Sequence, residues 1–436
     1  MTSYADRLEA LVESSAERCT TCGKCFEACP TVREIGLDAG ESKGRVGELL
    51  SLTREGGPAA EGLSKWLNAC DGSARCSDAC PEGINVRQWV TIAKLQALQA
   101  ERPAEVGATN AANRFRHMAQ AVRLLASMQL PSETLKRILA PAEKRRAEVL
   151  FYTGCNVLRT PHIVLNVMDI LDGLGLDFDV VGGTAHCCGV YQFQEADLPT
   201  YERIGHRTFQ RLGQSGAARV LTWCPTCTKN FDELEKDAAP PSFDLGHVSE
   251  FLAGNLDELK RHFLPGQPRR RVVIHEHLGI GATLSSMHRL LSAVPNLELL
   301  TIEQDSGFSY ACGGQAAKFK DREQAIHRAL AEGAIAAGAD TIVVRPGSGV
   351  DTVVGFIAGT DTIDLTAFTT QLLLGTDDRR APVVFTGSMR PHSHAHPDGP
   401  GNLRDAVAAA APHASQTSCT RTHGDFWCLV QEFGLR

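Results

Sequence analysis

The spacing of the cysteines constrains this chain of 436 residues more than any other feature. There are fifteen cysteines, an odd number, and many are grouped tightly, as CxxC pairs and one adjacent CC pair. The N-terminal stretch MTSYADRLEALVESSAE has no signal-peptide core, so we expect a cytoplasmic protein, or one that is peripheral on a membrane partner. Because disulfide frameworks belong mainly to exported chains, this grouping favours bound metal over disulfides.

Composition narrows the function classes further. The chain is 43% hydrophobic and 22% charged, with a net charge of −7, which is ordinary for a soluble globular protein of two to four domains. The basic runs EKRR (143–146) and RRR (269–271) are short and typical of solvated linkers, so no nucleic-acid partner is expected. No apolar run approaches the roughly 20 residues of a bilayer span, and we expect no transmembrane segment.

The first cysteine motif is CTTCGKCFEACP, which contains Cys19, Cys22, Cys25 and Cys29 and ends in Pro30. Its C-x2-C-x2-C-x3-C-P spacing is typical of iron–sulfur ligands, where the first three thiolates hold one [4Fe-4S] cluster and the fourth crosses to a second cluster. Soft sulfur donors suit such clusters, and the proline keeps the following helix away from them. A zinc ribbon is the alternative, which the spacing and the Cys-Pro ending disfavour.

The second motif is CDGSARCSDACP, which contains Cys70, Cys76 and Cys80. Where a repeat of the first motif would have a cysteine, it has Ser73. A serine oxygen is too hard, and its pKa too high, to replace a thiolate well. We therefore expect a [3Fe-4S] cluster at the second site. A labile fourth iron held by serine or water, a [4Fe-4S] cluster completed by another cysteine, and no second cluster are the alternatives.

The crossing rule divides the seven cysteines between two clusters. The [4Fe-4S] cluster takes Cys19, Cys22, Cys25 and Cys80. The second cluster takes Cys29, Cys70 and Cys76. The C-x5-C-x3-C-P spacing followed by EGIN (82–85) resembles the iron–sulfur subunits of succinate dehydrogenase and fumarate reductase, and this resemblance implies a [3Fe-4S] centre. A cluster with one thiolate fewer carries less negative charge. This favours a higher reduction potential for the second cluster than for the [4Fe-4S] cluster beside it.

We expect an α+β fold in several segments. Residues 148–240 and 271–349 alternate apolar strands with helices, which predicts parallel sheets with right-handed crossovers. GAARVLTWCPTC in the first of these units corresponds to GADTIVVRPGS in the second, and HCCGVY corresponds to ACGGQA, which indicates an internal duplication. A helical ferredoxin-like domain (1–100) and a helical connector (101–147) precede them, and a segment of different character (350–436) follows.

The first α/β unit carries a second kind of cysteine set. Its members each follow a predicted strand, and they are Cys155, Cys187, Cys188, Cys224 and Cys227. Loops at the carboxyl ends of parallel strands meet at one sheet edge, so these cysteines should converge there. A set of unliganded core cysteines is the alternative, which the adjacent Cys-Cys pair and the Cys-x2-Cys pair disfavour.

This five-cysteine spacing resembles the CCG domain of heterodisulfide reductase. The iron–sulfur subunits of glycolate and lactate oxidation systems are similar, because they join such a domain to a two-cluster ferredoxin in the same order. The resemblance covers about residues 15–349. It implies a non-cubane [4Fe-4S] cluster or a zinc ion at the five cysteines.

The second unit departs from the CCG pattern. Ala311-Cys312-Gly313-Gly314 replaces the family's CCGG, and Arg345-Pro346-Gly347-Ser348 replaces its CPxC. His275, His277 and Cys312 could form a zinc site, but we favour remnants of a lost site. In the heterodisulfide reductase family, substrate chemistry depends on clusters in both repeats. The loss therefore favours an electron carrier over a complete disulfide reductase.

Residues 350–411 resemble the middle of the L-asparaginase amino-terminal domain, in which Thr360 and Asp361 match the catalytic Thr-Asp pair. The family's first nucleophilic threonine has no counterpart, and Arg421 stands where its lysine would lie. Asparaginase-type amidohydrolase activity is therefore not expected. The tail is consistent with a gene fusion or a frame-shifted end, so Cys419 and Cys428 are interpreted as incidental.

These patterns predict an iron–sulfur electron-transfer subunit, an oxidoreductase component and not a stand-alone enzyme. It would take electrons from a flavin-dependent dehydrogenase of the hydroxy-acid type and pass them to a quinone or another acceptor, with a membrane partner in the second role. A thiol–disulfide oxidoreductase that uses the five-cysteine site is the alternative function, and an asparaginase-type hydrolase is the third.

Overall fold

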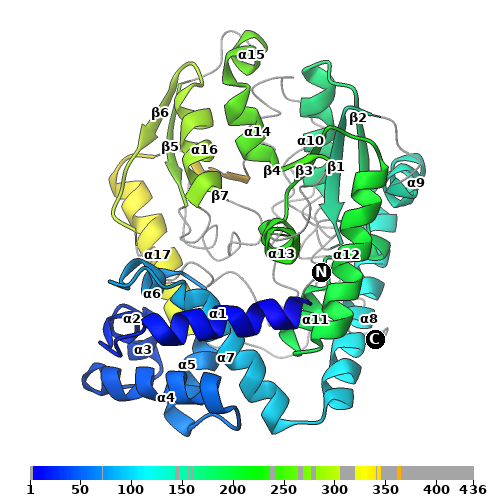
Figure 1. Ribbon diagram of the computed structural model, residues 1–436. Coiled ribbons are helices and arrows are strands. Elements are labelled where there is room, and N and C mark those ends of the chain that lie inside the picture. Colours follow the sequence, from blue (N-terminus) through cyan, green and yellow to red (C-terminus); the bar gives the residue numbers. More distant parts are fainter. Residues whose placement is uncertain are drawn as a thin grey trace, which may run out of the picture.

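Helices form one part of the molecule and two parallel sheets form the other (Figure 1). The computed structural model describes residues 3–70, 72–142, 147–155, 158, 161–235, 242–263, 269–275, 281–304, 320–339, 341–344 and 361–364. The mixture of helices with parallel strands confirms the α+β class. The domain boundaries drawn from the sequence stay predictions.

The first hundred residues are helical, as their pattern predicts. The helices are α1 (Tyr4–Arg18), α2 (Lys24–Glu27), α3 (Thr31–Glu34), α4 (Ser42–Glu55), α5 (Glu61–Ala69), α6 (Arg75–Asp78) and α7 (Val86–Glu101), with a 3-10 turn at Ala39–Glu41. They enclose a core around Phe26, Trp66 and Trp89, which are fully buried. The Trp89 indole N–H donates to Thr53 Oγ1 at 3.1 Å, which satisfies its polar atom inside this core.

Two helices connect this part to the first sheet. Helix α8 (Ala104–Gln129) is long and unbroken, and α9 (Ser132–Leu139) packs against the first sheet. Two prolines of this segment, Pro103 and Pro131, lie immediately before the two helices. Proline has no N–H to donate, which costs nothing at a helix start, so these prolines separate the helices without bending either one.

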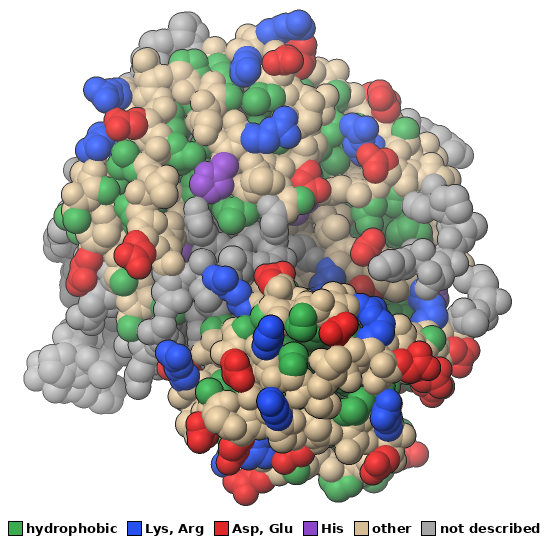
Figure 2. Space-filling view, turned by 60° about the vertical axis from the view of Figure 1, so that its left-hand side comes forward, with side chains coloured by type: hydrophobic (Ala, Val, Ile, Leu, Met, Phe, Trp, Pro, Cys, Tyr) green, Lys and Arg blue, Asp and Glu red, His purple; other side chains and the backbone are tan. Residues whose placement is uncertain are grey.

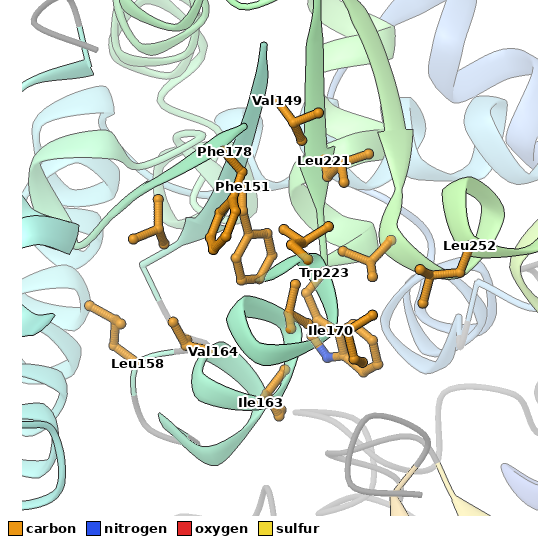
Figure 3. Packing of buried hydrophobic residues seen from close by; sticks show 14 of the residues in the cluster. Val149, Phe151, Leu158, Ile163, Val164, Ile170, Phe178, Leu221, Trp223 and Leu252 are labelled. Carbon is orange, nitrogen blue, oxygen red and sulfur yellow. The ribbon is translucent and has the colours of Figure 1, made fainter. Parts of the chain in front are cut away.

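The first sheet has four parallel strands in the order β2-β1-β3-β4. They are β1 (Val149–Gly154), β2 (Phe178–Gly182), β3 (Arg219–Thr222) and β4 (Asp244–His247). The helices between them are α10 (Pro161–Gly173), α11 (Val190–Gln194), α12 (Leu198–Gln214) and α13 (Pro225–Glu235). Figure 3 shows Phe151 and Leu221 of the sheet together with Ile170 of α10 in one apolar cluster, and burying such side chains is the main stabilising contribution to this unit.

The second sheet repeats this arrangement, with the order β6-β5-β7-β8. Its strands are β5 (Arg270–Ile274), β6 (Leu297–Leu300), β7 (Thr341–Val344) and β8 (Asp361–Asp364), and its helices are α16 (Gly281–Ser292) and α17 (Lys320–Ala336). Helices α14 (Val248–Gly254) and α15 (Leu256–Arg261) lie between the units, and α14 packs on α16. The same strand order in both sheets agrees with an internal duplication.

Strand β8 comes from the asparaginase-like segment. It pairs in parallel with β7, from Thr341 opposite Asp361 to Val344 opposite Asp364. It therefore lies where β4 lies in the first sheet. The sequence pattern predicted neither β4 nor β8.

Figure 2 shows one face of the molecule, on which acidic and basic side chains are interspersed. Of the helices in the described part of the chain, none combines the length and the apolar character needed to cross a membrane.

Candidate metal centres

The two cysteine loops of the helical part have the same backbone shape. Gly23 (φ 85°) and Ala74 (φ 63°) are both left-handed and both precede a one-turn helix. The amide of Phe26 donates to the Gly23 carbonyl at 3.0 Å, and that of Ser77 donates to the Ala74 carbonyl at 2.7 Å. Each residue of one loop has its counterpart in the other at a constant offset, and by this offset Ser73 corresponds to Cys22.

One cysteine of the second loop joins three of the first. A pocket in the helical part is lined by Cys19, Cys22, Cys25 and Cys80. Its other walls include the apolar side chains of Val46, Ile84 and Trp89. The structure therefore brings together the four cysteines that the crossing rule assigned to the [4Fe-4S] cluster.

The remaining cysteines of the two loops lie together as well. The Cys76 thiol interacts electrostatically with Cys70 and Cys29, and more weakly with Cys25. The indole N–H of Trp66 donates to Cys29 Sγ at 3.4 Å, and the Thr31 hydroxyl lies 3.2 Å from the same sulfur. Ser73 belongs to the same loop as Cys70 and Cys76 and is 7% exposed.

Burial destabilises the charged thiolate form of the cysteines at both cluster sites. It is the largest cause that raises the pKa of Cys25, to about 12, and neighbouring cysteines act in the same direction. Burial also raises the pKa of Cys76 well above its usual range. Thiolates in such surroundings need a cation to compensate their charge, and iron supplies it. These two sets of residues therefore fit iron–sulfur clusters.

The five-cysteine set gathers at the carboxyl ends of three adjacent strands. Cys155 follows β1, and the Cys187–Cys188 pair follows β2. After β3, Cys224 directly precedes α13 and Cys227 lies in its first turn. Because β1 is flanked by β2 and β3 in the sheet, these loops are neighbours at one edge. Four of the five cysteines are buried, with Cys188 only 1% exposed, and Cys224 is half-buried.

The five thiols form a continuous series of contacts. Cys187 is hydrogen-bonded to Cys155 and to Cys188, and Cys227 is hydrogen-bonded to Cys188 and to Cys224. The hydrogen bond with Cys187 is the largest cause that raises the pKa of Cys188, to about 12. Among the residues that the structure describes, no three His, Cys, Asp or Glu side chains are arranged to hold a single metal ion. A soft set of five thiols in one series fits an iron–sulfur group.

Neighbouring residues that the sequence analysis missed orient these sulfurs. The Asn230 amide donates to Cys188 Sγ at 3.4 Å, and the Gly189 N–H donates to Cys187 Sγ at the same distance. The Tyr152 hydroxyl donates to the His186 carbonyl at 2.6 Å and lies 3.8 Å from Cys227 Sγ. Asn230 follows Cys227 by one helical turn, and this spacing was the signal available in the sequence.

Glycine is required at one position of this edge. Gly154, at the end of β1, has a φ of +67°, and a Cβ added there would lie 3.0 Å from Cys227 Sγ. A side chain at this position would therefore be strained and would also push against a sulfur.

The candidate residues of the second unit are only partly described. His275 is buried, and its amide donates to the Val343 carbonyl at 2.9 Å. His277, Cys312 and the two replaced motifs (311–314 and 345–348) lie outside the described residues. So do Thr360, Arg421 and the last two cysteines, while Asp361 is the first residue of β8. A zinc site or an amidohydrolase site here stays untested.

Comparison with known families divides the chain in the same order. Residues 15–84 match the model of a 4Fe-4S dicluster domain, residues 149–232 that of a cysteine-rich domain, and residues 331–422 that of the asparaginase N-terminal domain. The chain therefore joins a 4Fe-4S dicluster domain to a CCG cysteine-rich domain, and it is an iron–sulfur protein. The asparaginase match begins within α17, earlier than the change of character expected near residue 350.

Curated relatives carry related names. Over 307 residues the chain is 25% identical to a fumarate reductase (CoM/CoB) subunit of Methanothermobacter marburgensis, covering 68% of this chain and 59% of that protein. It is 24% identical over 315 residues to an uncharacterized iron-sulfur protein of Methanocaldococcus jannaschii, covering 69% and 61%. An anaerobic glycerol-3-phosphate dehydrogenase subunit of Escherichia coli is 30% identical over 91 residues, covering 20% and 22%. The chain thus spans about three fifths of the first two relatives.

Proposed function

We propose that this protein is the iron–sulfur electron-transfer subunit of a larger oxidoreductase. Its electron donor would be a flavin-dependent dehydrogenase of the hydroxy-acid type, and its acceptor a quinone or a quinone-reducing membrane partner. The observation that carries the proposal is the pairing of the cysteines, in which Cys80 shares a pocket with Cys19, Cys22 and Cys25.

We assign the ligands by this pairing. A [4Fe-4S] cluster is held by Cys19, Cys22, Cys25 and Cys80, and a [3Fe-4S] cluster is held by Cys29, Cys70 and Cys76. The matching backbone of the two loops supports the second assignment, because it puts a serine at the position of a cysteine ligand. A further cluster of the non-cubane [4Fe-4S] type, with zinc as the alternative, is assigned to the five cysteines at the sheet edge.

Iron–sulfur clusters, when bound, accept and donate single electrons at potentials that depend on charge, hydrogen bonds to sulfur and solvent exposure. The residues of this chain control the last two. Trp66 and Asn230 donate hydrogen bonds to cysteine sulfurs, and the apolar walls of the pocket beside Cys80 limit access of water. These groups of the chain would therefore adjust the reduction potential of the cluster bound at each site.

The names of the relatives support a partner. One is named as a subunit of a fumarate reductase and another as a subunit of a glycerol-3-phosphate dehydrogenase, so both are parts of larger proteins. By analogy we propose that this chain works beside a separate protein that oxidises or reduces the organic substrate. The flavin and the hydroxy acid are proposed from the resemblance to the iron–sulfur subunits of glycolate and lactate oxidation systems.

Anaerobic purification tests the proposal. The isolated protein should be brown and contain iron and labile sulfide, with roughly seven to twelve irons per chain for these cluster types. Cys80→Ala should remove the first cluster and spare the second, whereas Cys76→Ala should do the reverse, as followed by EPR after oxidation and after dithionite. A colourless preparation that holds only zinc, or a Cys80→Ala variant that loses only the second cluster, would contradict the assignment.

A thiol–disulfide oxidoreductase is the second candidate, because five thiols in contact could exchange with a disulfide substrate. Thiolates are the nucleophiles in such exchange, and the raised pKa of Cys188 opposes that role in the metal-free site. Disulfide turnover that is unchanged in Cys187→Ala would exclude this function.

A further inference from the structure

Helix α13 contacts the five-cysteine edge at one end and the helical part at the other. Cys227 lies in its first turn, and the Asn230 amide donates to Cys188 Sγ at 3.4 Å. Near the last residue of the helix, Glu233 and Leu234 contact the helical part. Figure 1 shows α13 between the first sheet and helix α1. A single helix therefore joins the two parts that carry the candidate metal centres.

Two arginines of the helical part hold the carboxyl end of α13. The guanidinium of Arg87, on α7, lies 3.6 Å from the Glu233 carboxylate. The guanidinium of Arg7, on α1, donates to the Leu234 carbonyl at 2.5 Å, one of the last four carbonyls of the helix, which have no intrahelical partner. The Leu234 side chain is buried in the same apolar cluster as Tyr4 of α1. These contacts fix the end of α13 against the helical part.

Arg87 also contacts the second cysteine loop. Its backbone N–H donates to the Ser77 hydroxyl at 3.0 Å, and Ser77 directly follows Cys76, a ligand assigned to the second cluster. The side chains of Arg87 and Glu233 are 19% and 14% exposed, so solvent screens their ion pair only in part. Arg87 therefore binds the loop of the second cluster through its main chain and the helix of the five-cysteine edge through its side chain.

We propose that Arg87 and Glu233 are positioning residues of the electron relay, which hold the second cluster at a fixed separation from the five-cysteine edge and so set the rate of electron transfer between them. The step passes one electron from the second cluster, which is oxidised, to the cluster at that edge, which is reduced. No bond or proton changes place. The rate of such a step falls steeply as the separation grows, so a looser contact slows it. This inference rests on the proposed electron-transfer function and adds the two residues that position one of its steps.

The test uses the intact, anaerobically purified protein with Arg87→Met and Glu233→Gln combined. The two changes cancel in charge, and the backbone N–H of Arg87 still reaches Ser77. After flash reduction, we expect electron transfer from the second cluster to the five-cysteine edge to slow about three- to tenfold, because small misplacements of reacting groups reduce rates strongly. The magnetic interaction between the two centres, measured by EPR, should weaken, while the iron content stays that of the wild type. Arg87→Lys alone keeps the ion pair and should retain most of the rate.

Arg219→Met combined with Asp244→Asn is the matched control. These side chains form an ion pair at 3.4 Å between the first residues of β3 and β4, at the end of the sheet opposite to the cysteines. Their pair does not cross to the helical part, so its removal should leave the rate and the magnetic interaction unchanged. Arg87→Gln with Glu233→Gln serves as a second neutral variant where the first does not fold, and the same slowing is expected.

The outcomes separate the two proposals. A double variant that retains its iron and shows the wild-type rate and magnetic interaction overturns the inference and leaves the relay function standing. An equal slowing in the control also overturns it, because the effect would then not depend on the crossing contact. So does a wild-type protein that holds iron but passes no electron to the five-cysteine edge. A wild-type protein without iron would remove the relay function and the inference together.

Discussion

Ser73 and Cys22 occupy equivalent positions in two loops of the same shape, and their side chains differ only in oxygen or sulfur. The amides of Asp78 and Glu27 donate to the carbonyls of Ala74 and Gly23 at 3.1 Å in both loops. The backbone at Ser73 is therefore already formed for a ligand. The second loop has the backbone geometry of a ligand loop, but it lacks a soft sulfur donor at this position.

Ser73→Cys should convert the second cluster from three irons to four. We expect about one more iron per chain and loss of the EPR signal of the oxidised three-iron centre. Ser285→Cys, at an exposed serine of α16, adds a thiol far from the loops and should change neither quantity. Persistence of the three-iron signal in Ser73→Cys would show that the fourth corner lies elsewhere.

Trp66→Phe should make the second cluster harder to reduce. The variant keeps the edge-on packing against Phe26, whose ring centroid lies 4.9 Å from that of Trp66, but loses the N–H that donates to Cys29 Sγ. A hydrogen bond to a cluster sulfur favours the reduced form, and losing one worth about 1 kcal/mol should lower the reduced-to-oxidised ratio several-fold.

Redox titration measures this effect. The control is Trp89→Phe, whose indole N–H donates to Thr53 and not to a sulfur, and it should leave the second cluster unchanged. A Trp66→Phe variant with the wild-type titration would mean that the N–H···S contact has no influence on this centre.

At the scale of elements, the Glu195 carboxylate is one attachment of the cysteine-rich unit to the helices around it. Arg102 and Arg114 each contact a different oxygen of Glu195 at 2.6 Å, and Glu195 is 12% exposed. Burial opposes the ionisation of Glu195, but the hydrogen bonds from Arg114 and Arg102 outweigh it and hold its pKa below the usual value. Glu195 therefore joins α8 to the loop between α11 and α12.

Glu195→Gln should lower the free energy of unfolding by about 1.5–3 kcal/mol near pH 7, because it removes two charge-assisted hydrogen bonds. The folded-state pKa is below the unfolded one, so the contribution is fully present above the unfolded value, about 4.3. It is lost as the pH falls through the folded pKa.

Thermal unfolding of wild type and Glu195→Gln from about pH 7 down to about pH 2.5 measures this dependence, because the loss falls below the unfolded pKa. The difference in stability should shrink towards the acid end. Glu133→Gln is the control, since Glu133 pairs with Lys136 at 2.7 Å in an exposed position and should contribute almost nothing. A difference that is constant with pH would contradict the role of the carboxylate charge.

At the scale of the whole molecule, the N-terminal helix α1 also attaches the helical part to the cysteine-rich unit. The Tyr4 amide donates to Glu202 Oε1 at 3.0 Å, and its ring lies edge-on to Tyr201, with 5.2 Å between centroids. Tyr4 is 2% exposed. Helix α1 therefore holds the helical part against α12.

Tyr4→Ala should loosen this attachment. Removing a fully buried aromatic ring costs about 3–5 kcal/mol, and we expect faster proteolytic cleavage between the helical part and the first sheet. Glu9→Ala, an exposed position of the same helix, should leave the cleavage rate unchanged. Equal rates in Tyr4→Ala and wild type would mean that α1 does not hold the two parts together.

The helices and most strands follow from local patterns, but two strands do not. Strand β4 is short, includes Gly246 and is only partly buried, so it lacks the apolar run that identified β1 and β3. Strand β8 reads DTID, with an acidic residue at each end. Edge strands of this kind form because a neighbouring strand offers free backbone groups, which is a property of the assembled sheet.

The sequence by itself determined the candidate metal ligands and their expected pairing, because ligand type and spacing act within a dozen residues of chain. Only the tertiary structure decided what surrounds them. Trp66 beside Cys29 and Asn230 beside Cys188 meet through packing of distant segments. Such contacts have no local pattern, because the folded core sets the distance between residues far apart in the chain.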